Sequence, residues 1–227
     1  MDKKVSIIVV DYDVIRLQRQ ITSACLGNIQ KYTDPEDYEL ILIDQWKDKE
    51  NRLDGLDNKH QYIKIDKYIS TPHIGLSASY NLGAKESTGE YLVFMHNDVF
   101  VWEGWLRTLL AEIEGTEEVI MPHQGVTSRE MVLDFHKNPG GGHDDAGMFM
   151  MSRKAYDKTG GWDERFKAIY QDNPFRSKFP KGFRCTNKCI ITHLGCGTVY
   201  ALTDDEENKA YEEEGNLYNK LRSEGKI

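Results

Sequence analysis

The sequence predicts an α/β fold, in which an open mixed, mainly parallel sheet is flanked by helices on both faces. Residues 4–10 and 38–44 are rich in apolar, β-branched side chains, as in strands that are buried on both faces of a sheet. The apolar residues between and after these runs recur at helical spacing, so strand and helix patterns alternate along the chain. Such alternation is typical of a parallel sheet wrapped by helices.

Each further element has its own pattern. Residues 14–32 predict an amphipathic helix that ends before Pro35, and residues 76–85 predict a second helix. Short strands are expected at 61–65 and 91–95. The elements expected after these are a helix at 102–113, a strand at 119–121, an apolar segment at 146–151, a strand at 189–193 and a charged helix at 204–222.

The chain offers no clear boundary between domains. Residues 123–145 are polar and contain Gly140, Gly141 and Gly142, so we expect a long loop or lid there. No internal repeat and no linker-like segment divides the sequence. We therefore expect a single domain over residues 1–227.

The composition disfavours several classes of protein. With 39% hydrophobic and 11% aromatic residues, the 227-residue chain can bury a core and does not resemble a disordered protein. A formal net charge of -8 argues against nucleic acid as a partner. No apolar run approaches the ~20 residues of a transmembrane helix, and peripheral membrane contact stays open. Four cysteines, and a start without the apolar region of a secretory signal, predict a cytoplasmic protein.

Three common catalytic or nucleotide-binding motifs are absent. The chain contains neither a G-x-x-x-x-G-K-[ST] phosphate loop nor a G-x-S-x-G nucleophile turn. The first strand runs into Asp11-Tyr12-Asp13 instead of a glycine-rich turn, so a pyrophosphate could not approach the backbone closely there. P-loop NTPases, Rossmann dehydrogenases and α/β-hydrolases are therefore disfavoured.

Carboxylates stand at the ends of several expected strands. Asp11 and Asp13 follow the first strand, Asp44 ends the second, and Asp98 follows the strand at 91–95. In open α/β sheets, ligands bind beyond the carboxyl ends of the strands. Any one of these side chains could be a loop cap. Their gathering at one edge predicts a binding site.

Two blocks of sequence resemble family 2 glycosyltransferases with the GT-A fold. The first contains Asn81-x-Gly83, Ser87-Thr-Gly-Glu-Tyr-Leu92, and a strand that runs into His96-Asn97-Asp98 at the family's D-x-D position. The second contains Gly160-Gly-Trp-Asp-Glu-Arg-Phe166 and Tyr170-Gln-Asp172, which are similar to the family's G-G-F-D-E-x-F turn and E-D pair. The resemblance spans roughly residues 5–200.

The acid pairs of the family are halved in this chain. Asp44-Gln45 stands where relatives carry two aspartates, the D-x-D turn keeps only Asp98, and the E-D pair keeps only Asp172. These departures leave a non-catalytic relative that binds a nucleotide or glycan as one alternative. A sugar-phosphate nucleotidyltransferase is another, although the glycine- and arginine-rich loop of that class is missing after the first strand.

The resemblance implies an inverting glycosyltransferase that moves a sugar from a nucleotide-diphosphate donor, with UDP favoured, to a hydroxyl acceptor, commonly in glycan assembly. Residues 1–115 would bind the nucleotide sugar, residues 116–200 would form the acceptor side, and residues 201–227 would form a C-terminal helix. A divalent cation, Mn²⁺ or Mg²⁺, would bind Asp98 and His193 and offset the charge of the leaving diphosphate. Packing at a strand end is an equal alternative for His193.

The expected donor contacts come from strand ends and from basic residues. Asp11 and Asp44 would accept hydrogen bonds from the nucleoside, and Tyr12 would either stack on the base or belong to ordinary packing. A cationic clamp on the phosphates would use Arg176, Lys178 and Arg184, each of which could instead be a solvated surface charge. The other donor-site residues that the motifs imply are Ser77, Asn81, His96 and Asn97.

Asp172 occupies the position of the family's catalytic base and would take the proton from the acceptor hydroxyl. Its alternative is an N-cap for a helix that starts near Pro174. The acceptor itself is expected to contact Trp162, Asp163 and Glu164. Trp162 and Trp102 have flat faces that could stack on a sugar ring, and either could equally belong to the core.

A zinc site is a separate hypothesis for the C-terminal cysteines. Cys185, Cys189, His193 and Cys196 are ligand types that zinc prefers. On a strand, however, the first three would spread over about 26 Å at ~3.3 Å per residue, which is too far for one ion. We therefore disfavour zinc there.

Overall fold

The computed structural model describes residues 4–12, 16–46, 62–125, 147–168, 170–179, 183–194 and 204–227. Asp13, Cys196 and the expected lid from residue 126 onward lie outside these ranges, so those expectations stay untested. Residues 123–125 of the expected lid belong to a strand.

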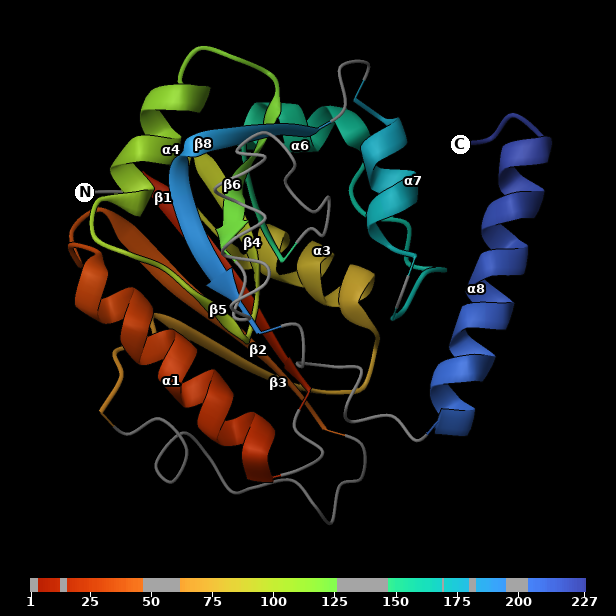
Figure 1. Cartoon of the computed structure of the whole chain (residues 1–227), viewed down its shortest axis with the longest axis horizontal. Coiled ribbons are helices and arrows are strands. Elements are labelled where there is room, and N and C mark those ends of the chain that lie inside the picture. The colour runs from red at the N-terminus through yellow and green to blue at the C-terminus, as the bar shows by residue number, and fades with distance from the viewer. Residues whose placement is uncertain are drawn as a thin grey trace.

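Within the described ranges, one eight-stranded sheet forms the centre of the molecule, in the order β3-β2-β1-β4-β7-β6-β8-β5 (Figure 1). Four of its seven strand pairings are parallel, so the sheet is mixed and mainly parallel, as expected. The strands are β1 (Val5–Tyr12), β2 (Tyr38–Trp46), β3 (Lys67–Pro72), β4 (Tyr91–His96), β5 (Val99–Phe100), β6 (Val119–Gly125), β7 (Met148–Ser152) and β8 (Phe183–His193).

Helices cover both faces of this sheet, which confirms the predicted architecture. The described helices are α1 (Arg16–Tyr32), α3 (Leu76–Glu86), α4 (Trp105–Ile113), α6 (Arg153–Thr159), α7 (Asp172–Ser177) and α8 (Asp204–Ser223). Figure 1 shows α1 and α3 on either side of the first strands. Because parallel connections are right-handed, a connection to β2 on one side of β1 and a return to β4 on the other place these helices on opposite faces.

The same reversal of strand order creates a switch point between β1 and β4. The chain moves outward from β1 to β2 and β3, then returns to place β4 on the other side of β1. Val10 pairs with His96 and Asp11 pairs with Asp44, so the ends of these strands are level. Ligands of open α/β sheets bind at such a point.

The core explains why the central strands carry so few polar residues. All eight residues of β1 are buried, and the side chains of Ile7, Ile8 and Val9 are fully inaccessible. α3 packs on β1 at Gly83, where an added Cβ would overlap the Cγ2 atom of Ile8. Gly83 of the Asn81-x-Gly83 motif is therefore required by helix–strand packing.

The Ser87-Thr-Gly-Glu segment also has a structural role. The carboxylate of Glu39, at the start of β2, accepts hydrogen bonds from the Ser6 hydroxyl at 2.6 Å and from the Thr88 hydroxyl at 3.0 Å. Gly89 lies so close to β1 that a Cβ there would be 2.6 Å from the backbone nitrogen of Ser6. The guanidinium of Arg153 binds the Ser87 hydroxyl at 2.7 Å. These contacts hold the segment against the amino ends of the strands, away from the switch point.

Several element boundaries differ from the sequence prediction. No strand occurs at residues 62–65; the strand begins instead at Lys67, because Asp66 joins β2 first through two hydrogen bonds with the backbone of Leu40. The helix expected from residue 102 begins at Trp105, after Gly104 in a left-handed conformation with φ 80°. β6 and β8 run in parallel and extend further than their apolar cores suggested.

Candidate active site

A network of buried polar groups occupies the carboxyl ends of β1 and β4. The carboxylate of Asp11, fully buried at the end of β1, accepts a hydrogen bond from the Thr22 hydroxyl of α1 at 2.9 Å. It also accepts one from the Asn97 amide at 2.9 Å, and that amide reaches Thr22 at 2.8 Å. Asn97 was expected to bind the donor; its side chain instead holds Asp11 in place.

A second group lies at the end of β2. The carboxylate of Asp44 is only 4% exposed and accepts a hydrogen bond from the Tyr68 hydroxyl on β3. The next side chain, Gln45, accepts the backbone N–H groups of Ile74 and Gly75 at 2.8 and 3.0 Å. Gln45 thereby fixes the backbone that leads into α3. Relatives carry a second acid in place of Gln45.

Tyr12 lies beside these carboxylates. Its ring stacks on the imidazole of His73 with centroids 4.1 Å apart and an interplanar angle of 24°. Tyr12 is 7% exposed, so one face of the ring is already covered by protein. Ser77, in the first turn of α3, is fully buried, and no partner of its hydroxyl is found among the described residues.

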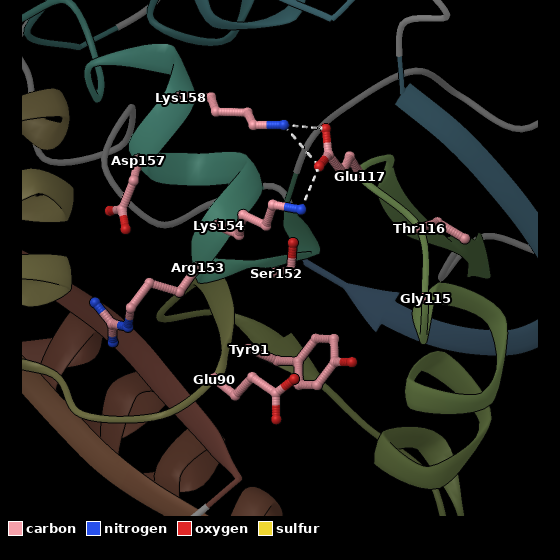
Figure 2. Close-up of a pocket in the computed structure, with 10 residues that line it drawn as sticks. All are labelled: Glu90, Tyr91, Gly115, Thr116, Glu117, Ser152, Arg153, Lys154, Asp157 and Lys158. Atoms are coloured by element: carbon pink, nitrogen blue, oxygen red, sulfur yellow. Dashed lines mark hydrogen bonds and ion pairs between the residues drawn. The ribbon is translucent and has the colours of Figure 1, made fainter.

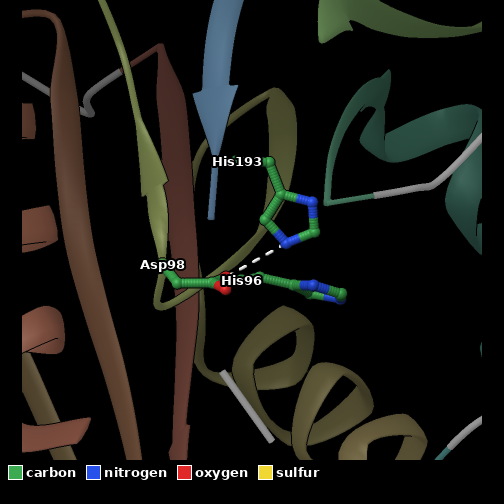
Figure 3. A group of neighbouring side chains, drawn as sticks. All are labelled: His96, Asp98 and His193. Atoms are coloured by element: carbon green, nitrogen blue, oxygen red, sulfur yellow. Dashed lines mark ion pairs between the residues drawn. The ribbon is translucent and has the colours of Figure 1, made fainter. Parts of the chain in front are cut away.

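Three potential metal ligands meet beside this edge. His96 ends β4, Asp98 follows two residues later, and His193 ends β8. Figure 3 shows the imidazole of His193 directed at the Asp98 carboxylate, with Nε2 3.1 Å from Oδ1. The side chains of Asp98 and His193 are 1% and 5% exposed. One ligand atom from each of the three residues lies within 4.8 Å of the others.

The backbone of Gly147 contacts two residues of this cluster. An added Cβ at residue 147 would lie 2.7 Å from Nδ1 of His193, so the imidazole packs directly on the glycine backbone. The carbonyl oxygen of Gly147 accepts the backbone N–H of His96 at 2.8 Å. The glycine therefore fixes the imidazole of His193 and the backbone of His96.

The predicted acceptor residue Trp162 is a core residue. It is 3% exposed and stacks on Phe175 of α7 with ring centroids 3.9 Å apart and an interplanar angle of 10°. Its indole cannot stack on a sugar in this position, because protein rings cover it. Trp102, the other tryptophan considered for stacking on a sugar, is 54% exposed, and its ring lies 6.3 Å from the ring of Tyr32.

Asn81 is likewise engaged within the protein. Its amide nitrogen donates to the Trp162 carbonyl at 3.0 Å and to Glu164 at 2.8 Å. Its amide oxygen accepts from the Tyr156 hydroxyl and from the Trp162 backbone N–H, both at 2.8 Å. Because these bonds use the whole capacity of the amide, Asn81 joins α3 to the turn at 160–164 and is not available to a donor.

Asp172 is the first residue of α7 and is half-buried. The cap position is Gln171, which makes no side-chain capping bond, so the alternative of Asp172 as the N-cap does not match the helix start. The stacking of Phe175 on Trp162 fixes this short helix.

Two further residues expected on the acceptor side, Asp163 and Glu164, precede α7 in the chain. Glu164 is exposed, and Asp163 pairs with Arg165 at 2.6 Å. The hydrogen bond from Arg165 lowers the pKa of Asp163 despite its partial burial.

The loop before Asp172 is held by α8, which stands at the side of the molecule in Figure 1. The buried carboxylate of Glu214 accepts three backbone N–H groups, from Lys167 and Ala168 at 2.9 Å and from Tyr170 at 3.1 Å. The ring of Tyr170 also stacks on Tyr218 of α8, with centroids 5.8 Å apart. Sequence reasoning missed this contact, because nothing in the acidic pattern of α8 singles out one glutamate.

The expected cationic clamp is not brought together. Arg184 lies at the start of β8, opposite Ile120, and so at the far end of the strand from His193. Its guanidinium pairs with Glu112 at 2.8 Å and with Glu118 at 3.0 Å. Arg176 is half-buried in α7, and Lys178 follows that helix, where burial lowers the pKa of its amine. We therefore withdraw Arg184 from the phosphate site.

The cysteines that the structure describes do not form a metal site. Cys189 is buried and Cys185 is exposed. Among the described residues, the one group that could hold a metal ion is His96, Asp98 and His193. Cys196 lies outside the described residues, so the zinc hypothesis itself stays untested.

A separate open groove of about 780 Å³ lies at the amino end of β4 (Figure 2). Its lining includes Tyr91 and Ser152, which pair in register there. Lys154 and Lys158 reach across it to Glu117 at 2.9 and 2.5 Å. Hydrogen bonds from Lys158 and Lys154 lower the pKa of Glu117 to about 2. Because these cations are already paired, the groove is less suited to an anion than the switch point.

The fold and the strand-end site together define an α/β protein of the GT-A-like class. Residues 6–186 match glycosyl transferase family 2, so the chain belongs to this family. The structure is similar to residues 1–349 of S. aureus TarS, with a TM-score of 0.62 and 12% sequence identity, over 97% of this chain and 72% of that one. At this identity the likeness shows the fold alone. No curated protein matches the sequence. In the described residues, no helix is long and apolar enough to cross a membrane.

Proposed function

We propose that this family 2 glycosyltransferase is a metal-dependent, inverting enzyme that transfers a sugar from a nucleotide-diphosphate donor, with UDP favoured, to a hydroxyl acceptor in glycan assembly. The observation that carries the proposal is the buried pair of Asp98 and His193, 3.1 Å apart at the switch point of the sheet. Ligand binding in open α/β sheets concentrates there. The proposal includes a cytoplasmic location, which the low cysteine content of the sequence favours.

The residues at this edge fit a divalent cation. A buried carboxylate costs free energy unless it is paired or binds a cation, and Asp98 is 1% exposed. Its neighbour His193 offers an imidazole nitrogen, and carboxylate and imidazole are both ligands of Mn²⁺. Asp98 and His193 would hold the ion. When bound, the ion would offset the negative charge of the donor diphosphate.

The nucleoside would lie beside the ends of β1 and β2. The carboxylates of Asp11 and Asp44 are held in register and could accept hydrogen bonds from a pyrimidine or ribose. Asn97 and Thr22 fix Asp11, while Tyr68 fixes Asp44. Such fixed acceptors favour binding, because little ordering is needed when the donor arrives.

Asp172 is the proposed base. The acceptor hydroxyl attacks the anomeric carbon from the face opposite the diphosphate, and the proton moves to the Asp172 carboxylate. The new glycosidic bond forms as the bond between the anomeric carbon and the diphosphate oxygen breaks, with the electron pair leaving on the diphosphate. The contacts of α7 with Trp162, and of the preceding loop with Glu214, would hold this carboxylate in place.

The experiment that tests this function is release of nucleotide from a panel of UDP- and GDP-sugars, with and without Mn²⁺. We expect Mn²⁺-dependent release of UDP from one member, with water or an added glycan as acceptor. Tight nucleotide binding without turnover of any sugar in the panel would favour the non-catalytic alternative. Pyrophosphate release from a nucleoside triphosphate would identify a nucleotidyltransferase instead.

A further inference from the structure

We propose that His96 is a third protein ligand of the metal ion, and that the resulting set of two imidazoles and one carboxylate makes the site prefer Co²⁺ or Zn²⁺ over Mg²⁺. This inference rests on the proposed metal-dependent function and specifies its cofactor. The sequence had indicated His96 only as a donor contact.

The geometry brings the three side chains to one point. Ligands at octahedral or tetrahedral angles around an ion, each at roughly 2.0–2.2 Å, lie about 3.0–3.5 Å apart. Nε2 of His193 and Oδ1 of Asp98 already have this separation, at 3.1 Å. The rings of His96 and His193 are 5.3 Å apart at an angle of 63°, and the ligand atoms of all three residues lie within 4.8 Å of one another (Figure 3). A rotation of the half-buried His96 ring toward the ion would complete the set.

The backbone around the cluster is fixed without an ion. The N–H of His96 donates to the Gly147 carbonyl, and its own carbonyl is 3.8 Å from the Cys25 thiol. The Gly147 backbone covers the Nδ1 side of His193, which leaves Nε2 on the side of Asp98. His193 therefore presents one particular nitrogen to the ion.

The choice of metal follows from the ligand types. Mg²⁺ demands an octahedral shell of oxygen and keeps its waters, so two imidazoles offer it little. Imidazole nitrogen suits zinc, iron, nickel and copper, and affinity for nitrogen and oxygen ligands rises from Mn²⁺ through Co²⁺ toward Cu²⁺. With a single carboxylate, the site has little electrostatic advantage for a hard cation. Mn²⁺ should bind with intermediate affinity.

The test uses metal ions alone, on protein stripped with a chelator. Calorimetric titration of the wild type should show Co²⁺ and Zn²⁺ binding at least ~10-fold more tightly than Mg²⁺. Co²⁺ should give visible absorption bands that report nitrogen ligands. The His96→Ala variant should bind Co²⁺ ~10- to 100-fold more weakly with altered bands, and His96→Asp should move the preference toward Mg²⁺ and Mn²⁺.

Cys185 is the exposed one among the described cysteines, and its thiol could compete for these ions. Cys185→Ser is therefore the control and should bind Co²⁺ as the wild type does. Equal affinity of the wild type for Mg²⁺ and Co²⁺ would overturn the preference. Unchanged Co²⁺ affinity and spectrum in His96→Ala would remove His96 from the site. Neither result would bear on Mn²⁺-dependent sugar transfer. Tight Co²⁺ binding without any sugar transfer would instead reject the proposed function and leave the proposed metal site in place.

Discussion

The imidazole of His193 packs on the backbone of Gly147 so closely that a Cβ on residue 147 would lie 2.7 Å from Nδ1. The two residues belong to separate segments of the chain, just before β7 and at the end of β8, and meet beside Asp98. A glycine at this position is therefore a condition for the metal site. Gly147 is not among the glycines with positive φ, so the requirement concerns space and not backbone conformation.

Gly147→Ala should push the His193 ring away from Asp98 and weaken metal binding by ~10-fold or more, as seen when groups that orient a ligand are lost. Calorimetric titration with Mn²⁺ measures the effect. Gly27→Ala is the matched control, because an added Cβ there has no neighbour within 4 Å. It should leave metal affinity unchanged. Wild-type affinity in Gly147→Ala would mean that the position of His193 does not matter to the ion.

Glu214→Ala should loosen the loop that leads to Asp172, because three backbone N–H groups lose their shared acceptor. Hydrogen bonds to a charged group contribute about 1.5–3 kcal/mol each, so the midpoint of thermal unfolding should fall. Hydrogen exchange at residues 166–172 should become faster. Glu213→Ala, at an exposed neighbour on the same helix, should change neither quantity. Unaltered exchange in Glu214→Ala would show that α8 does not hold this loop.

Asp172→Asn should abolish transfer but spare the donor site. The amide keeps the size of the side chain and cannot accept the proton, so the rate should fall by the ~10²–10⁴-fold that general bases contribute. Nucleotide affinity in the presence of Mn²⁺ serves as the internal control and should not change. Full activity with the nucleotide sugar that the wild type uses would show that another group takes the proton.

Arg184→Ala should leave nucleotide binding unchanged, since its guanidinium pairs with Glu112 and Glu118 at the start of β8. Fluorescence titration with UDP and Mn²⁺ at low and moderate salt would measure this. A loss of affinity that shrinks with added salt would indicate a phosphate contact after all, and would restore the clamp that the sequence suggested.

The sequence predicted the architecture well because apolar runs and helical spacing are local signals. The strand ends followed from these signals, so the sequence alone was enough to place Asp11, Asp44 and Asp98 at one edge of the sheet. The shift of the third strand to Lys67 could not be predicted, because it depends on Asp66 binding the backbone of β2. That contact is long-range, and strand propensity does not report it.

The sequence predicted the positions of the motif residues better than it predicted their roles. Asn81 and Trp162 belong to recognisable motifs, yet Trp162 is buried and Asn81 is bonded to the backbone of Trp162. A motif identifies which residues to consider, and only their contacts in the folded structure show whether the role of each residue is chemical or structural. The structural roles of Thr22, Gln45 and Gly147 were missed for the opposite reason. Each is an ordinary residue type whose importance comes from a partner distant in sequence.

The central claim is that a metal ion at Asp98 supports nucleotide binding, and calorimetric titration of UDP with and without Mn²⁺ tests it most directly. The wild type should bind UDP at least ~10-fold more tightly with Mn²⁺, because the ion offsets the charge of the diphosphate. In Asp98→Asn, which keeps the size of this buried side chain, the gain from Mn²⁺ should disappear while the protein stays folded. The same Mn²⁺-dependent gain in the folded variant would contradict the account.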